Sequence, residues 1–325
     1  MDILQYLFRF YWPPFYLLSL CLFSTMYILI YNFTTNVLKA MRYFLYASCT
    51  ATFVSLTLAF GTQTRNIDNE NSMGLLCDGF CKFLGPTFCA TCYKAYATSV
   101  LTVNLINLHT LYYRTVCLKL INAQEIGRNT LIFSWHYLFI IAYLTSTLIP
   151  PSDHLAVYNE TLAHYPEYDY TPYLNFGGFS QAQKVYLDNS TVAMFLVTLY
   201  FPMIGSYWKH QAMKLLKPHV SPNTSDATRV MFRKMIIGLN FQIFLPMLSY
   251  IPVVFLFILI QVTGHQFLIS QYTITCLGAL PCFLDPIFQI YFITPYRNAV
   301  RAFFVRKPSA DGSWATRVSA VNSVA

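Results

Sequence analysis

The sequence predicts an all-α membrane protein, a bundle of seven transmembrane helices, and three observations favour this fold class. Its 325 residues are 56% hydrophobic and only 10% charged, less than half the charged share of soluble domains. Seven apolar segments are long enough to cross a bilayer. Lys and Arg gather in alternate loops, as they do in multi-pass proteins. A disordered or nucleic-acid-binding chain is excluded, because 28 Phe and 25 Tyr could not be left in water.

The predicted spans are runs of mostly apolar residues, of which about 20 are needed to cross roughly 30 Å of hydrocarbon. The sixth and seventh spans are separated only by the stretch TGHQFLIS, whose last three residues already belong to the seventh span, so a six-span chain is the alternative. The membrane domain is expected to cover residues 1–308, with a disordered tail over 309–325. The expected spans are residues 10–31, 43–60, 83–112, 129–150, 190–208, 235–262 and 268–294.

The charge of the loops predicts which side of the membrane each one faces. The segments on one side, including the tail, hold sixteen of the 21 Lys and Arg but only three of the 13 acids. The opposite loops and the N-terminus carry nine acids against four basic residues. Basic loops are cytoplasmic in multi-pass proteins, which places the tail inside and the N-terminus outside. Because the bias holds for every loop, it favours seven spans over six.

Two N-glycosylation sequons agree with this orientation. They begin at Asn159 and Asn189, in the long loop between the fourth and fifth spans, which is predicted to lie outside. Sequons at Asn32 and Asn223 fall on the predicted inner side, so a single sequon is weak support. Glycosylation is expected at Asn159 or Asn189.

Four cysteines, Cys77, Cys81, Cys89 and Cys92, crowd the outer end of the third span. Zinc is disfavoured, because Cys89 and Cys92 lie in an apolar helix and no His is among them. No metal or other cofactor is predicted. An outer position is oxidising, so the hypothesis is a disulfide that involves Cys77 or Cys81. Its partner stays open, because the long loop between the fourth and fifth spans contains no Cys.

A few ionisable side chains fall inside the predicted spans, where each costs about 2.5–3.5 kcal/mol at the helix centre and so indicates function. Lys94 either meets an anionic ligand group in a cavity or extends along its own stem to the outer interface. His109 and His136 are interpreted as hydrogen-bonded packing residues. Asp285 precedes Pro286 in the last span, and the pair is interpreted as a polar hinge that faces the bundle.

A ligand is expected to bind among the outer halves of the spans. Tyr93, Tyr96 and Tyr250 offer an aromatic lining, and Lys94 a charged partner. The sequence contains no G-x-S-x-G, no H-E-x-x-H and no phosphate-binding glycine loop. Intramembrane carboxylates are too few for an ion relay, and the two halves show no corresponding broken helices. An enzyme and a secondary transporter are both disfavoured.

The span layout and the end of the third span resemble G-protein-coupled receptors. The span ends in NLHTLYYR, with Arg114 where rhodopsin-like receptors carry the Arg of Asp/Glu-Arg-Tyr, although Tyr112 and Tyr113 precede it here. The resemblance implies that Arg114 contacts a heterotrimeric G protein. Its resting partner stays open and is either one of the two tyrosines or a group on another helix.

The last span also resembles this class. Asp285-Pro286 stands where the class has Asn-Pro-x-x-Tyr, but Gln289 occupies the Tyr position and the nearest Tyr is Tyr291. The resemblance implies a switch formed by Asp285, Pro286 and Tyr291. We expect Asp285→Leu to shift basal activity in either direction.

The segment PYRNAVRAFF after the last span resembles the short amphipathic helix that lies on the inner membrane surface of these receptors. Arg297 and Arg301 are four residues apart, on one face, where they can meet anionic lipid. Val300, Phe303 and Phe304 would then bury in the membrane. Arg297 is included in the expected G-protein-coupling region.

Three stretches, CKFLGPTFCATCY, YYR and DPIFQIYFITPYRNAV, are most similar to the nematode serpentine chemoreceptors of the Str superfamily, class delta. The resemblance implies a chemosensory receptor of the plasma membrane, with sensory cilia as a candidate location. It implies a small-molecule environmental ligand and a heterotrimeric G protein as partners, beside membrane lipid. The alternatives are a seven-helix ligand-gated cation channel subunit, which would have its N-terminus inside, and a non-signalling membrane protein.

Overall fold

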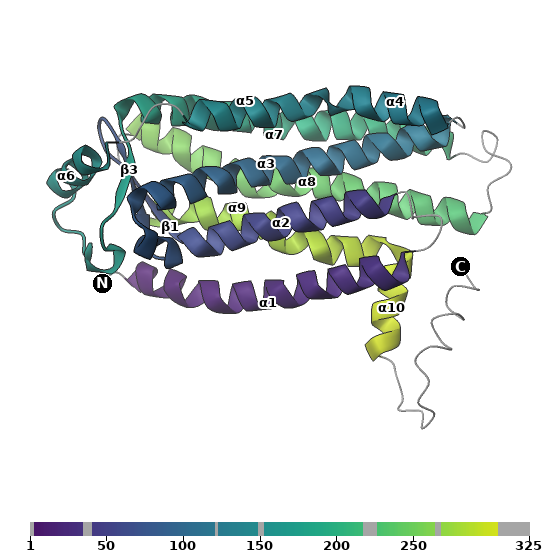
Figure 1. Cartoon of the computed structure of the whole chain (residues 1–325), viewed down its shortest axis with the longest axis horizontal. Coiled ribbons are helices and arrows are strands. Elements are labelled where there is room, and N and C mark those ends of the chain that lie inside the picture. The colour runs from purple at the N-terminus through teal and green to yellow at the C-terminus, as the bar shows by residue number, and fades with distance from the viewer. Residues whose placement is uncertain are drawn as a thin grey trace.

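The computed structural model describes residues 3–34, 41–120, 123–148, 153–216, 226–263 and 268–304. Its long helices run side by side, and a small β-sheet lies at the end of the bundle beside the N-terminus (Figure 1). The elements in chain order are α1 (Ile3–Phe33), α2 (Arg42–Thr62), β1 (Thr64–Asp68), β2 (Met73–Cys77), the 3-10 turn η2 (Phe80–Leu84), α3 (Pro86–Lys119), α4 (Ala123–Phe133), the 3-10 turn η3 (Ser134–His136), α5 (Tyr137–Leu148), α6 (His154–His164), the 3-10 turn η4 (Thr171–Tyr173), β3 (Gly177–Phe179), α7 (Gln181–Leu215), α8 (Asp226–Thr263), α9 (Leu268–Phe292) and α10 (Thr294–Phe304).

Each predicted span falls on a largely helical segment, and most helices extend beyond the predicted ends. The fourth span is not one regular helix, since η3 joins α4 to α5, and its last two residues lie outside the described ones. In the described part of the chain, four helices are both long and apolar enough to cross a membrane by themselves, so seven spans stay a prediction. These four segments are Leu4–Phe33, Arg42–Thr62, Arg229–Ser249 and Leu268–Phe292.

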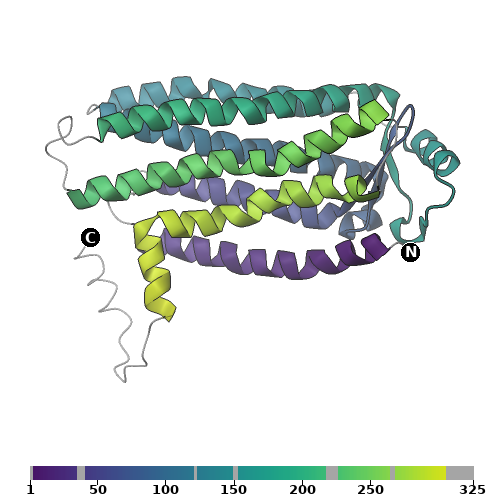
Figure 2. The same cartoon turned by 180° about the vertical axis from the view of Figure 1, so that it is seen from behind.

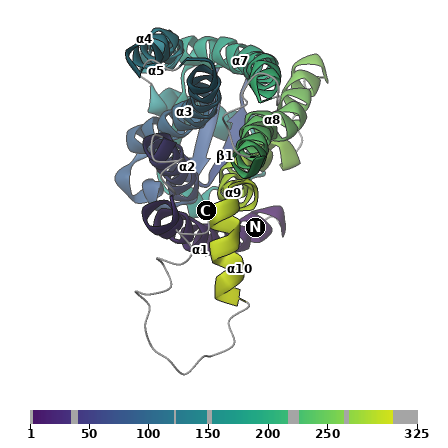
Figure 3. The same cartoon turned by 90° about the vertical axis from the view of Figure 1, so that its right-hand side faces the viewer.

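The third helix, α3, occupies the centre of the bundle. Viewed along the bundle, it lies among α2, α5, α7 and α8, and it packs against all four (Figure 3). Every residue from Val103 to Leu111 is buried. A helix that is buried on all sides must place its polar residues in the core, so Asn104 and Asn107 need partners on neighbouring helices.

The fold is mostly helical, as predicted, but the all-α class misses a three-stranded antiparallel sheet. β1 and β2 form a hairpin between α2 and α3, and β3 pairs with β2 from the long loop after α5. The backbones of β2 and β3 approach closely, since a Cβ on Gly178 would collide with the Met73 carbonyl. We call β1, β2, β3 and α6 the cap, because they cover the end of the bundle beside the N-terminus.

At the opposite end, α10 leaves the bundle at a sharp angle to α9 (Figure 2). Tyr296 anchors it: the side chain is fully buried, and its hydroxyl lies 2.8 Å from Thr34 Oγ1 at the end of α1. Arg301 and Phe303 are exposed on α10. Since they are two residues apart, Arg301 and Phe303 lie on opposite sides of the helix, so a charged and an apolar side chain are both available to a membrane surface. The predicted tail, 309–325, lies outside the described residues.

Candidate functional site

A single carboxylate joins three helices in the core. Asp285 of α9 is 3% exposed and accepts hydrogen bonds from Gln242 Nε2 of α8 at 2.5 Å and from Gln289 Nε2 at 2.9 Å. Thr52 Oγ1 of α2 donates to the same carboxylate at 3.4 Å. A buried carboxylate is tolerated only when donors replace its hydration shell. The predicted polar hinge at Asp285 and Pro286 therefore lies inside the bundle, where it ties α9 to α2 and α8.

The central helix extends this polar region. Asn107 Oδ1 accepts a hydrogen bond from Ser48 of α2 at 3.0 Å. Beside it, a cavity of about 10 Å³ is lined by Asn104, Asn107, Gln242 and Asp285 among apolar groups, which is room for about one water molecule. Asn104 Oδ1 is buried and has no hydrogen-bond partner among the described residues. The core around Asp285 is thus polar on α2, α3, α8 and α9 together.

Arg114 is sequestered near the far end of α3. The side chain is buried, Nε donates to Met41 Sδ just before α2, and the guanidinium lies 5.4 Å from the ring of Phe232 on α8. Its Nη2 is buried without a hydrogen-bond partner among the described residues. Burying a charged group without a full set of partners costs several kcal/mol. Arg114 is therefore held by apolar and sulfur contacts that leave part of its hydrogen-bonding capacity unused.

The two tyrosines before Arg114 pack in other directions. Tyr112 stacks on Phe133 of α4 with ring centroids 4.0 Å apart and meets the edge of Trp208 of α7 at 4.7 Å. Tyr113 packs against Phe44 of α2 at 5.1 Å. Both tyrosine rings therefore pack between α3 and its neighbours, and Tyr113 also lies close enough to Arg114 to interact with it electrostatically. The sequence left this partner open.

The two histidines of the spans contact tyrosine hydroxyls. His109 Nδ1 lies 3.4 Å from Tyr137 Oη of α5, and His136 Nε2 lies 3.1 Å from Tyr200 Oη of α7. Both imidazoles are buried. Both histidines are therefore hydrogen-bonded packing residues in this conformation.

The remaining residues of the predicted switch lie apart from the core. Tyr291 is 57% exposed, and the Arg297 guanidinium lies 5.9 Å from its ring. Arg114 follows the cavity-lining Asn107 by two helical turns, or about 10 Å along the axis. The structure therefore separates Asp285, Arg114 and the Tyr291–Arg297 pair into three places.

The predicted ligand-lining residues of α3 contact the cap and α9. Tyr93 Oη accepts a hydrogen bond from Asn66 of β1 at 3.3 Å. Lys94 Nζ lies 5.3 Å from the ring of Phe179 of β3. Lys94 thus reaches toward the cap, in the direction expected of extension to the outer interface.

The Tyr96 side chain extends from α3 to the backbone of α9. Its hydroxyl donates to the Thr275 carbonyl at 3.2 Å, and a Cβ on Gly278 would collide with that hydroxyl. The glycine therefore leaves room for the Tyr96 hydroxyl to reach the backbone of α9. The Tyr250 side chain lies outside the described residues.

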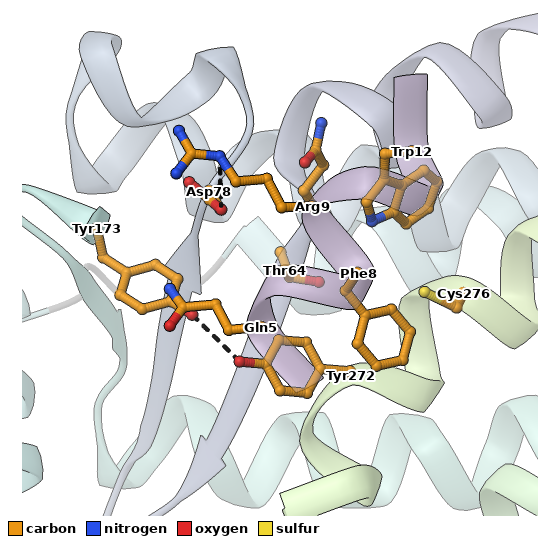
Figure 4. A pocket seen from close by; sticks show the side chains of 10 residues that line it. Gln5, Phe8, Arg9, Trp12, Thr64, Asp78, Tyr173, Tyr272 and Cys276 are labelled. Carbon is orange, nitrogen blue, oxygen red and sulfur yellow. Dashed lines mark hydrogen bonds and ion pairs between the residues drawn. The ribbon is translucent and has the colours of Figure 1, made fainter. Parts of the chain in front are cut away.

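A pocket that the sequence did not indicate lies between α1, the cap and α9 (Figure 4). Phe8 of α1 stacks on Tyr272 of α9 at 4.7 Å, and Tyr272 Oη lies 3.4 Å from Tyr173 Oη. Gln5 is 3% exposed, and its Nε2 is buried without a hydrogen-bond partner among the described residues. The pocket, about 10 Å³ in volume, is lined by Gln5, Phe8, Arg9, Trp12, Gln63, Thr64, Asp78, Tyr173, Tyr272 and Cys276.

Charged groups surround this pocket at the cap. Arg9 Nε lies 3.9 Å from Asp78 Oδ2, and Lys82 Nζ lies 2.9 Å from Asp78 Oδ1. Arg65 of β1 is 1% exposed and donates from Nε to Gln271 Oε1 of α9 at 2.7 Å. These residues come from α1, β1, the segment after β2 and α9. No local motif joins them, so the pocket could not be predicted from the sequence.

The long loop is anchored through α6. His154 Nδ1 accepts a hydrogen bond from the Gly178 amide at 3.3 Å, and burial lowers the pKa of His154 below its ordinary value. Asn159, the first sequon residue, is exposed on α6. The side chain of Asn189, on α7, lies outside the described residues.

Of the crowded cysteines, Cys77 and Cys89 form a disulfide that joins β2 to α3. Cys81, the other disulfide candidate, is a buried free thiol in this structure. The partner that the sequence left open is thus a cysteine of the same cluster, one turn into α3.

A bundle of long apolar helices, with a buried carboxylate in its core and a buried arginine near one end of the central helix, is the architecture of a multi-helix membrane protein. The chain belongs to the family described as serpentine type 7TM GPCR chemoreceptor Srd, whose model matches residues 8–302. The resemblance to class delta is confirmed, and the chain is a membrane protein of a chemoreceptor family.

Three relatives come from Caenorhabditis elegans. Serpentine receptor class delta-63 is 57% identical over 293 residues, which cover 89% of this chain and 90% of the relative. Class delta-51 is 27% identical over 270 residues, 82% of this chain and 78% of the relative. Class delta-59 is 26% identical over 294 residues, 90% of this chain and 89% of the relative.

Proposed function

We propose that this protein is a G-protein-coupled chemosensory receptor with seven spans and an outer N-terminus, which detects a small-molecule environmental cue at the plasma membrane. Within the chemoreceptor family, the observation that carries the proposal is the burial of Arg114 between Met41 and Phe232. A cation with unused donors near the end of the central helix is suited to a partner that binds only after the helices part. This conformation is the resting one.

The switch is a shift between two packings of the bundle. Agonist binding favours the state in which the inner part of α8 moves away from α3, so that Phe232 uncovers Arg114 for the G protein. Asp285 opposes this movement, because it lies on α9 and its carboxylate accepts a hydrogen bond from Gln242 of α8. α8 and α9 also pack closely at Gly238, where a Cβ would lie 2.6 Å from Phe292 Cβ.

The pocket between α1, the cap and α9 is the proposed first contact site of the cue. Gln5 offers an unused donor there, and Phe8 and Tyr272 offer aromatic faces. This chemistry suits a small organic molecule that carries one hydrogen-bond acceptor. Since the pocket holds about one water molecule, a larger cue enters only as α1 and α9 separate.

Coupling through a G protein is distinguished from channel activity by measuring both in the same cells. The receptor is expressed with and without a defined Gα subunit, and a panel of small organic molecules is applied while nucleotide exchange and membrane current are recorded. We expect a response that requires Gα. A current that persists without Gα would favour the channel subunit, and tags on the two termini of unpermeabilised cells then give the orientation.

The orientation predicts glycosylation on the long loop. Because Asn159 is exposed on α6, the double variant Asn159→Gln with Asn189→Gln is expected to migrate like glycosidase-treated wild type on a gel. The matched control is Asn32→Gln with Asn223→Gln, whose sequons are predicted to lie inside and whose loss should leave migration unchanged. If only the control pair changes the migration of the protein, the orientation is the inverse of the proposed one.

A further inference from the structure

Two cysteine thiols lie together where the cap meets the bundle. Cys81 in η2 is 1% exposed and Cys92 on α3 is 8% exposed, and the two thiols are close enough to interact within one buried cluster. Both belong to a buried cluster that also contains the Cys77–Cys89 disulfide. A second pair of sulfur atoms is thus held next to an oxidised pair.

The path of the chain explains why the sulfur atoms pair in this order. Cys89 and Cys92 are three residues apart on α3, so they share one face of the helix one turn apart. Between Cys77 and Cys81, a Cβ on Gly79 would collide with the Gly61 carbonyl, so the chain passes directly against the end of α2. η2 then brings Cys81 to α3 one turn beyond the first disulfide.

We infer that Cys81 and Cys92 form a second disulfide in the mature receptor. The inference rests on the proposed orientation, which places this end of the bundle in the oxidising lumen and later outside the cell. Each thiol gives up its proton, and the pair passes two electrons to the disulfide of a lumenal thiol–disulfide oxidoreductase. That disulfide becomes a dithiol, and one bond forms between the two Sγ atoms.

The bond is structural rather than a reversible switch. Burial, together with the neighbouring Cys92 thiol, raises the pKa of Cys81 to about 12. Exchange proceeds through the thiolate, so the Cys81 thiol reacts slowly once the fold has closed around it. The bond therefore forms while η2 still docks onto α3, and afterwards the same burial shields it from reductants.

The second disulfide would hold an apolar turn in place. In η2, Phe80, Phe83 and Leu84 are 52%, 72% and 58% exposed, while Cys81 between them points into the protein. Exposed aromatic side chains beside a membrane helix are suited to the membrane interface. A bond from Cys81 to α3 fixes which face of the turn meets lipid.

Peptide mapping under non-reducing conditions tests the inference on the full-length receptor from a eukaryotic membrane. Free thiols are blocked with N-ethylmaleimide in denaturant, and the protein is cut with chymotrypsin. Cleavage after Leu76, Phe80, Phe83, Phe88 and Tyr93 places Cys77 and Cys81 in separate peptides and keeps Cys89 with Cys92. We expect peptides 77–80, 81–83 and 89–93 to be joined by two disulfides, with no N-ethylmaleimide on any of them.

Three outcomes would overturn the inference, and they differ in what else they affect. If peptide 81–83 carries N-ethylmaleimide while 77–80 stays joined to 89–93, the second disulfide is absent and the first is unaffected. A bond between Cys77 and Cys81 replaces it with another connectivity. If all four cysteines carry N-ethylmaleimide, neither disulfide is present, and this end of the bundle does not face the oxidising side as the proposed orientation requires. Cys49 and Cys282, buried thiols of the bundle core, are the controls and should carry the label throughout.

Variants separate Cys89 from Cys92. In Cys77→Ser with Cys89→Ser, peptide 81–83 should remain joined to 89–93, and in Cys81→Ser with Cys92→Ser only 77–80 should be joined to it. If the first variant does not reach the cell surface, the wild-type map still decides, because fragmentation of the three-peptide species assigns each bond. A first variant that folds and shows no bond contradicts the inference.

Discussion

Arg114→Ala is expected to abolish activation of the G protein while surface abundance and ligand binding survive. Alanine removes the cation that the G protein would contact, and truncating one partner of a buried charged contact costs about 2–5 kcal/mol, more than a tenfold loss. Folding is spared, because Arg114 is held by Met41 and Phe232 without a charged partner. Nucleotide exchange on the co-expressed Gα, normalised to surface receptor, measures the effect.

The matched control is Arg128→Ala, which removes an exposed cation from α4, the helix that follows α3, and should leave exchange near wild type. Phe232→Ala gives the complementary result, since it uncovers Arg114 and should raise basal exchange. Normal signalling by Arg114→Ala would remove the G-protein mechanism and return the channel subunit and the non-signalling protein to consideration.

Asp285→Leu is expected to raise basal signalling and to lower surface abundance. Leucine removes the acceptor shared by Gln242 and Gln289, and each amide left unpaired in the core costs about 1–3 kcal/mol. The loss falls on the conformation in which α8 and α9 are joined, so the balance shifts toward the separated one by about tenfold for every 1.4 kcal/mol. Basal nucleotide exchange per surface receptor is the measurement.

Asp285→Asn serves as its control, because the amide keeps one oxygen and gains donors. Gln289 Oε1 is buried without a partner among the described residues, so it can accept from the new amide while Gln242 keeps its acceptor. Abundance and basal exchange should stay near wild type. Equal basal exchange in the Leu and Asn variants would show that Asp285 does not hold the resting state.

The helices were predictable, but their ends were not. Apolar composition marks the part of a helix that meets lipid, whereas α3 continues to Lys119 because nothing between residues 112 and 119 breaks a helix. The sheet was missed because β1 and β2 have five residues each and β3 has three. Such strands lack the length for an alternating pattern, and they depend on contacts with distant segments.

In the candidate site, too, some residues could be predicted from the sequence and others could not. Asp285 was predictable because a charge in a membrane span is costly, but its partners Gln242 and Gln289 are neutral amides, whose cost alone does not single them out. Arg114 was found from its motif, while Phe232 lies more than a hundred residues away. Its role depends on how α3 and α8 pack, which no local pattern encodes.

The cap acts as a brace across the bundle. β2 is bonded to α3 through Cys77–Cys89, while β1 holds α9 through Arg65 with Gln271 and through Thr64 with Thr275. Since β1 and β2 are paired along their full lengths, α3 and α9 part at this end only if the hairpin or the two hydrogen bonds from β1 to α9 break. Any separation of these two helices is therefore expected to be smallest at the cap and to increase along the bundle. The cap then acts as the hinge, and the largest displacement falls at the end that carries Arg114.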